Sequence, residues 1–161
     1  MNYNDTYNNY GYNYDNNLKQ FNSDEIIMPA DAISLIRSSI EDENNDMAFY
    51  DNLIRKAPSQ KEKMIIHGIR NEEKHGQILR KIYYDFTKQN ISYQTPVNYN
   101  FQSSSYRDDL EKALFSELAA VKKYRKILSV MSGDYYTLLM SIMTDENIHA
   151  AKYNFLLGNQ R

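Results

Sequence analysis

One pattern of glutamate and histidine residues occurs twice in this chain, and the second copy follows the first by 74 positions. In each copy a glutamate lies 29 residues before a Glu-x-x-His tetrapeptide. The two copies consist of Glu43, Glu72 and His75, and of Glu117, Glu146 and His149. Residues three apart lie on one face of an α-helix, and such a set of four carboxylates and two imidazoles holds two metal ions in the core of a four-helix bundle. The repeat therefore predicts four helices that each contribute one carboxylate.

Turn signals divide each copy into a helical hairpin. Midway between the two glutamates of the first copy, Pro58 disfavours helix at Ala57, and Ser59 with Glu62 is typical of a capping box that begins the next helix. The segment 131–134 carries a glycine stop signal and an aspartate start signal midway through the second copy. Each glutamate then lies about 21 Å from its turn, so an antiparallel pair brings the two carboxylates to one level.

Apolar residues recur every three or four positions along each predicted helix, and every glutamate of the repeat takes a place in that apolar series. On the second helix the series comprises Ile65, Ile69, Leu79, Ile82 and Phe86. Ionised carboxylates buried at one level repel one another, and each costs several kcal/mol unless cations or protons neutralise it. Bound metal is the expectation. A metal-free bundle with protonated carboxylates, or a coincidental spacing of surface glutamates, are the alternatives that remain open.

The composition agrees with one small domain of long helices. The chain has 161 residues, of which only five are glycine and three proline. A net charge of −2 with interspersed signs gives no nucleic-acid signature. The absence of cysteine excludes disulfides and thiol catalysis, and no apolar run is long enough to span a membrane. We therefore expect a cytoplasmic protein that binds neither nucleic acid nor membrane.

Two segments differ from the four predicted helices. Residues 1–24 are rich in Asn and Tyr and poor in aliphatic side chains, so we expect a disordered tail followed by a bundle over residues 25–161. A tail that serves in self-association or attachment to a coat is the alternative. The segment at about 88–103 joins the hairpins, and its extended length permits a crossover along the whole bundle.

Three runs of the sequence resemble the rubrerythrin branch of the ferritin-like superfamily, and the resemblance extends over about residues 29–158. The runs are 40–50, 69–75 and 115–125. The resemblance implies an all-α, antiparallel, ferritin-like four-helix bundle of two helical hairpins joined by a long crossover. It also implies two iron ions and a chemistry of peroxide or oxygen. The ligand types suit manganese as well, so a manganese or mixed-metal site stays open.

The resemblance also assigns roles to the residues of the repeat. It implies that Glu72 and Glu146, or their partner glutamates, bridge the two irons and that His75 and His149 are terminal ligands. Catalysis would then act through the metals held by the four glutamates, and no further cofactor is expected. His67 has no glutamate three residues before it, and we expect it at the surface.

Four further positions bear on the site. Tyr50 and Tyr124 each follow a repeat glutamate by seven residues, which lets a phenol reach a ligand carboxylate; core packing is the alternative. Rubrerythrins carry an additional carboxylate one turn after the third-helix glutamate, where this chain has Ala120. The corresponding position in the first helix is Asp46, which is either a seventh ligand or a solvated residue.

The resemblance favours a peroxidase of the rubrerythrin type, and it leaves other function classes open. The principal alternatives are iron oxidation with storage, and a structural module of spore-coat type that displays the Tyr/Asn-rich tail. Manganese catalase chemistry is a further one. Because the chain has no cysteine, it cannot contain a rubredoxin module. A peroxidase would therefore need an external electron donor, either a rubredoxin-like protein or a flavin reductase. By analogy we expect a homodimer.

Overall fold

The computed structural model describes residues 29–70, 74–92 and 105–160, and within these ranges the chain forms helices and no strand. The helices are α1 (Pro29–Lys56), α2 (Gln60–Arg70), α3 (Lys74–Thr87), α4 (Tyr106–Leu128) and α5 (Gly133–Gly158). Residues 71–73 separate α2 from α3 and lie outside the described residues, as do the predicted tail 1–24 and most of the predicted crossover. The two short helices together occupy one position of the bundle.

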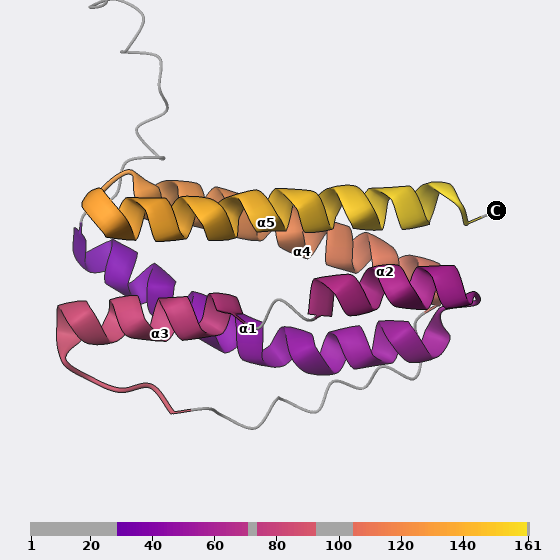
Figure 1. The fold of residues 1–161 in the computed structure, drawn as a ribbon, viewed down its shortest axis with the longest axis horizontal. Helices are drawn as coiled ribbons and strands as arrows, with labels where there is room; N and C mark the ends of the chain where they lie inside the picture. Colours follow the sequence, from indigo (N-terminus) through magenta and orange to yellow (C-terminus); the bar gives the residue numbers. More distant parts are fainter. Residues whose placement is uncertain (1–28, 71–73, 93–104, 161) are drawn as a thin grey trace, which may run out of the picture.

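The helices form two hairpins that pack on each other (Figure 1). In the first hairpin, α2 packs against the second half of α1 and α3 against its first half. In the other hairpin α4 runs antiparallel to α5. The two hairpins meet where α1 contacts α4. The end of α3 and the start of α4 lie at opposite ends of the bundle (Figure 1), so the connection between them has to cover its length. The predicted all-α four-helix bundle of two hairpins is confirmed.

Both predicted turns lie where the sequence signals indicate. The first helix ends at Lys56, and the Ser59 side chain accepts a hydrogen bond from the backbone N–H of Glu62 at 3.2 Å. At the second turn Gly133 adopts a φ of +59°, a left-handed conformation that favours glycine. The capping bond of Ser59 and the left-handed conformation of Gly133 therefore mark the ends of these helices.

The apolar core consists of two clusters, one toward each end of the bundle. The first includes Ile36, Ile40, Leu79, Ile82, Ile127, Leu139 and Ile142. The second includes Leu53, Ile66, Ile69, Leu110, Tyr153 and Leu156. Along α1, α4 and α5, the repeat residues Glu43, Glu117, Glu146 and His149 lie in sequence between the members of the two clusters. A polar layer therefore divides the core, and its walls are apolar on both sides.

One residue of the predicted apolar series is exposed. The prediction for Phe86 is wrong, because its side chain is 50% exposed and its ring packs against Tyr135 at 5.1 Å between centroids. Phe86 lies in the last turn of α3 and meets only the first turn of α5, through Tyr135, so periodicity alone overestimates its burial. In the described ranges, no helix has the length and apolar character that a membrane span requires.

Candidate metal centre

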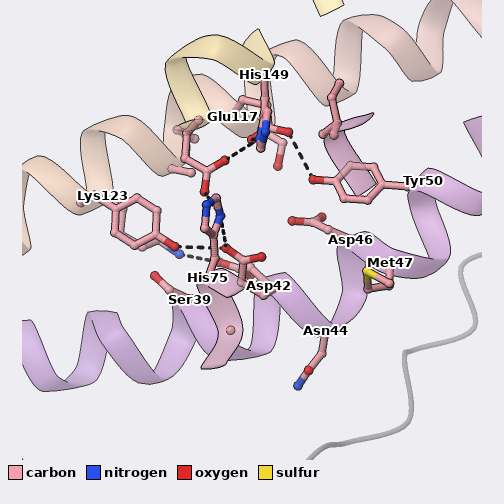
Figure 2. A pocket seen from close by; sticks show the side chains of 18 of the residues that line it. Ser39, Asp42, Asn44, Asp46, Met47, Tyr50, His75, Glu117, Lys123 and His149 are labelled. Carbon is pink, nitrogen blue, oxygen red and sulfur yellow. Dashed lines mark hydrogen bonds and ion pairs between the residues drawn. The ribbon is translucent and has the colours of Figure 1, made fainter. Parts of the chain in front are cut away.

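The polar layer lines a cavity of about 370 Å³ at the middle of the bundle. Figure 2 shows His75, Glu117 and His149 converging on this cavity from three different helices. Glu43 of α1 and Glu146 of α5 also line it. Five of the six residues of the sequence repeat therefore meet in one volume. The sixth, Glu72, lies outside the described residues.

The five side chains form two overlapping groups of potential ligands. Glu43, His75 and Glu146 make the first group, and Glu117, Glu146 and His149 make the second. In each group one ligand atom per residue lies within 4.8 Å of the others. Glu146 belongs to both groups, which is the position of a carboxylate that bridges two ions.

The two oxygens of Glu146 face different histidines. Its Oε1 lies 3.2 Å from Nδ1 of His75, and its Oε2 lies 3.2 Å from Nδ1 of His149. The same ring nitrogens also face the outer carboxylates: Nδ1 of His75 is 3.6 Å from Oε1 of Glu43, and Nδ1 of His149 is 3.9 Å from Oε2 of Glu117. The arrangement is therefore close to twofold symmetric about Glu146.

Burial and mutual proximity shift the proton affinities of this layer strongly. Burial, together with the neighbouring Glu146, raises the pKa of Glu117, and burial raises that of Glu43. Burial would also raise the pKa of Glu146, but hydrogen bonds with His149 and His75 outweigh it and lower that pKa to about 2. Burial lowers the pKa of His75, but the two adjacent carboxylates outweigh it and raise that pKa to about 11.

These pKa shifts show that the buried negative charge of the polar layer has to be compensated. Without metal, protons on His75 and on the Glu117 carboxyl compensate the buried negative charge. Divalent cations would supply the same compensation, and carboxylate oxygens with imidazole nitrogens are ligands that iron, manganese and zinc accept. The donor set therefore fits a dinuclear metal centre.

Two tyrosines cross between the hairpins to reach the carboxylates. The hydroxyl of Tyr50 on α1 donates to Oε1 of Glu117 on α4 at 3.3 Å. The hydroxyl of Tyr124 on α4 donates to Oε1 of Glu43 on α1 at 3.4 Å. The two tyrosines are themselves 74 residues apart, so the internal repeat extends to the residues that orient the outer carboxylates.

Asp46 lines the same cavity and points into it from α1 (Figure 2). Burial and the nearby Glu43 raise its pKa to about 8. Asp46 is not a member of either group of potential ligands. On the facing helix Ala120 also lines the cavity. The structure thus places Asp46 beside the candidate ligands, while His67 is exposed and outside the cavity.

Asp145, which the spacing of the repeat does not single out, lies behind one of the histidines. Its Oδ2 is 3.2 Å from Nε2 of His75. Asp145 directly precedes Glu146 in the chain, but nothing in the spacing shows that its side chain reaches across to α3. The short motif Asp-Glu-x-x-His is the only sequence signal that could have drawn attention to it.

One comparison with known proteins identifies a relationship. The family model of rubrerythrin matches residues 34–157. This range contains all the candidate ligands and both tyrosines. No curated protein and no solved structure shows significant similarity to the chain.

Proposed function

The chain belongs to the rubrerythrin family, and on this premise we propose that its bundle binds two iron ions and reduces hydrogen peroxide with them. The observation that carries the proposal is the position of Glu146, whose two oxygens each lie 3.2 Å from a different histidine. A carboxylate in that position can bridge two ions. The choice of iron rests on the family, because the ligand types alone also accept manganese or a mixed pair.

Each ion would have its own set of ligands. Glu43 and His75 would hold one ion, Glu117 and His149 would hold the other, and Glu146 would be shared. By the sequence repeat we include Glu72 as the fourth carboxylate. Two ferrous ions bound in this way would each supply one of the two electrons that peroxide, together with two protons from solvent, needs to become two molecules of water.

The tyrosines keep the outer carboxylates in place. Burial raises the pKa of Tyr50 and of Tyr124 well above 10, so both phenols stay protonated and remain donors to Glu117 and Glu43. A carboxylate that accepts such a bond keeps one orientation, which is the usual role of residues behind metal ligands. The apolar clusters on both sides of the layer exclude bulk water from the ends of the bundle.

The reaction also requires an electron donor, which the chain itself does not provide. With no cysteine in the sequence, the electrons that restore the site after each reaction would come from a rubredoxin-like protein or a flavin reductase. A setting that keeps such donors reduced, as the cytoplasm does, suits this chemistry. We further propose a homodimer by analogy with other ferritin-like hairpins.

Metal analysis followed by stopped-flow oxidation tests the proposal. The protein should bind two iron ions per chain and, in the reduced form, consume about one equivalent of peroxide per site before it stops. Reaction should resume when a rubredoxin-like or flavin donor is added, and oxygen should react more slowly than peroxide. His75→Ala should lose iron and slow the first oxidation, whereas His67→Ala, which changes an exposed histidine, should not.

Three outcomes would contradict the proposal. Failure to bind metal would remove its basis. Sustained loss of peroxide without a donor would indicate disproportionation of the manganese catalase type. Rapid oxidation by oxygen with many iron ions retained per chain would instead indicate iron storage.

A further inference from the structure

A second, smaller cavity of about 140 Å³ lies beside the central one, in the seam between α1 and α4. All of its lining residues belong to these two helices. Five of them also line the central cavity, namely Asp42, Asp46, Tyr50, Ser116 and Glu117. The two cavities are therefore neighbours, and both lie along the line on which the two hairpins meet.

The central cavity reaches the surface of the molecule along this seam. Ser116 and Ala119 on α4 line the cavity and are exposed. On α1, Asp42 lines both cavities, and its side chain is 59% exposed. Glu117 follows Ser116 directly in the chain, but it is only 6% exposed. Exposed residues that line the cavity thus lie next to a buried candidate ligand.

Contacts tie the two helices together on both sides of this opening. On one side, Nζ of Lys123 on α4 donates to the carboxylate of Asp42 and, at 3.0 Å, to the hydroxyl of Ser38 on α1. On the other side, Nζ of Lys112 on α4 lies 5.4 Å from the centroid of the Phe49 ring on α1. The seam therefore has fixed ends, and its width between them depends on the side chains that α4 presents there.

Those side chains are short. Between Lys112 and Lys123, the residues of α4 that line the central cavity away from the buried layer are Ser116, Ala119 and Ala120. Residues three and four positions apart share one face of a helix, so these three lie on the face that meets α1. A longer side chain at exposed Ser116 or Ala119 would extend into the opening. The opening therefore depends on the small size of these residues.

We propose that solutes of about the size of hydrogen peroxide reach the candidate metal centre through this opening between α1 and α4, and that the size of Ser116 and Ala119 determines what enters. The inference rests on the proposed function, which makes peroxide the substrate. The smaller cavity, at about 140 Å³, exceeds the roughly 10–15 Å³ that one water needs and falls below the roughly 300 Å³ of pockets for drug-sized ligands. Bulky organic hydroperoxides should therefore be excluded.

An introduced thiol tests access without any metal, because the chain has no cysteine. Ser39 on α1 is 2% exposed and lines the central cavity, and Ser39→Cys replaces only its hydroxyl oxygen by sulfur. In the full-length, metal-free protein this thiol should react with methyl methanethiosulfonate. Adding Ser116→Phe and Ala119→Phe should slow that reaction by about tenfold. The larger benzyl methanethiosulfonate should react with the Ser39→Cys protein at least about tenfold more slowly than the methyl reagent.

Three controls accompany this assay. Ser116→Ala with Ala119→Ser exchanges the two side chains, keeps both small, and should leave the rate unchanged. Ala32→Cys, fully buried and lining neither cavity, should react far more slowly than Ser39→Cys. Ser141→Cys, at an exposed position of α5, should react with both reagents at similar rates and so corrects for their intrinsic reactivity.

Cobalt kinetics connect the opening with the metal centre. A block at an entrance slows entry and exit equally, so it changes rates without changing affinity. In the variant with both phenylalanines, and to a smaller extent in Ser116→Phe alone, Co²⁺ should bind more slowly and should be removed by a chelator more slowly, by the same factor of about ten in the double variant. The dissociation constant and the melting temperature of the metal-free protein should stay the same.

The outcomes separate this inference from the proposed function. Equal thiol reactivity with and without the two phenylalanines, or equal reactivity of Ser39→Cys toward the small and the large reagent, would overturn the inference and leave the metal centre intact. A weaker dissociation constant with unchanged rates of entry would also overturn it. Failure of cobalt to bind would contradict the proposed metal centre, while the thiol assay would still decide where the cavity opens.

Discussion

Asp46 should make the metal-free protein less stable as the pH rises, and Asp46→Asn should remove this effect. Its carboxyl lines the central cavity, and burial with the nearby Glu43 raises its pKa from 3.8 to about 8. The unfolded chain gives up this proton near pH 4, whereas the folded chain retains it until about pH 8. A raised carboxyl pKa therefore stabilises the fold at low pH, and the contribution is lost as the pH rises through 8.

The size of the effect follows from the difference between the two pKa values. At 1.36 kcal/mol per pKa unit, the linkage relation gives a loss of about 4 kcal/mol in the free energy of unfolding between pH 5 and pH 9. Asp46 is only partly buried by its surface area, and solvent screening at such a position reduces the expected loss to about 2 kcal/mol. The comparison begins at pH 5 because Glu146, whose pKa is lowered to about 2, contributes its own loss of stability below that pH.

Urea denaturation in the presence of a chelator measures this contribution. The unchanged protein and Asp46→Asn are unfolded at pH 5, 7 and 9, and the difference between them cancels the other titrating groups. Relative to the unchanged protein, the variant should gain about 2 kcal/mol from pH 5 to pH 9. Asp134→Asn, at an exposed position at the start of α5, serves as the control. A difference that stays constant with pH would refute the reasoning.

Three shorter predictions concern stability. Metal should raise the melting temperature, and the increase should shrink in Glu146→Gln because one shared carboxylate serves both positions; identical melting curves with and without metal would favour a metal-free bundle. Tyr153→Phe should raise the free energy of unfolding by about 1 kcal/mol, since the buried hydroxyl has no hydrogen-bond partner among the described residues; a loss in urea denaturation would point to a bound water. Asp109→Ala should cost about 3 kcal/mol by the same assay, because Lys56 and Asn52 both bond to that carboxylate, and adding Lys56→Met should recover part of the loss.

The helices and turns could be predicted because their causes are local. Pro58 and Ser59 end one helix and begin the next through their own backbone and side-chain chemistry. Gly133 permits the left-handed conformation at the second turn. The equal distances from these turns to the repeat glutamates bring the carboxylates to one level, so the spacing predicts that all six candidate ligands meet, and five of them line one cavity in the structure. Glu72 is the one that lies outside the described residues.

What the sequence by itself determined is the level of each side chain along the bundle, because helical rise converts residue number into height. Only the tertiary structure decided which side chains meet across that level. The separate contacts of the two Glu146 oxygens, the crossing of Tyr50 to Glu117, and the reach of Asp145 to His75 all depend on how far each helix is rotated about its axis. The packing of the two apolar clusters sets that rotation. Residue spacing along a single helix carries no information about how the helices pack on one another.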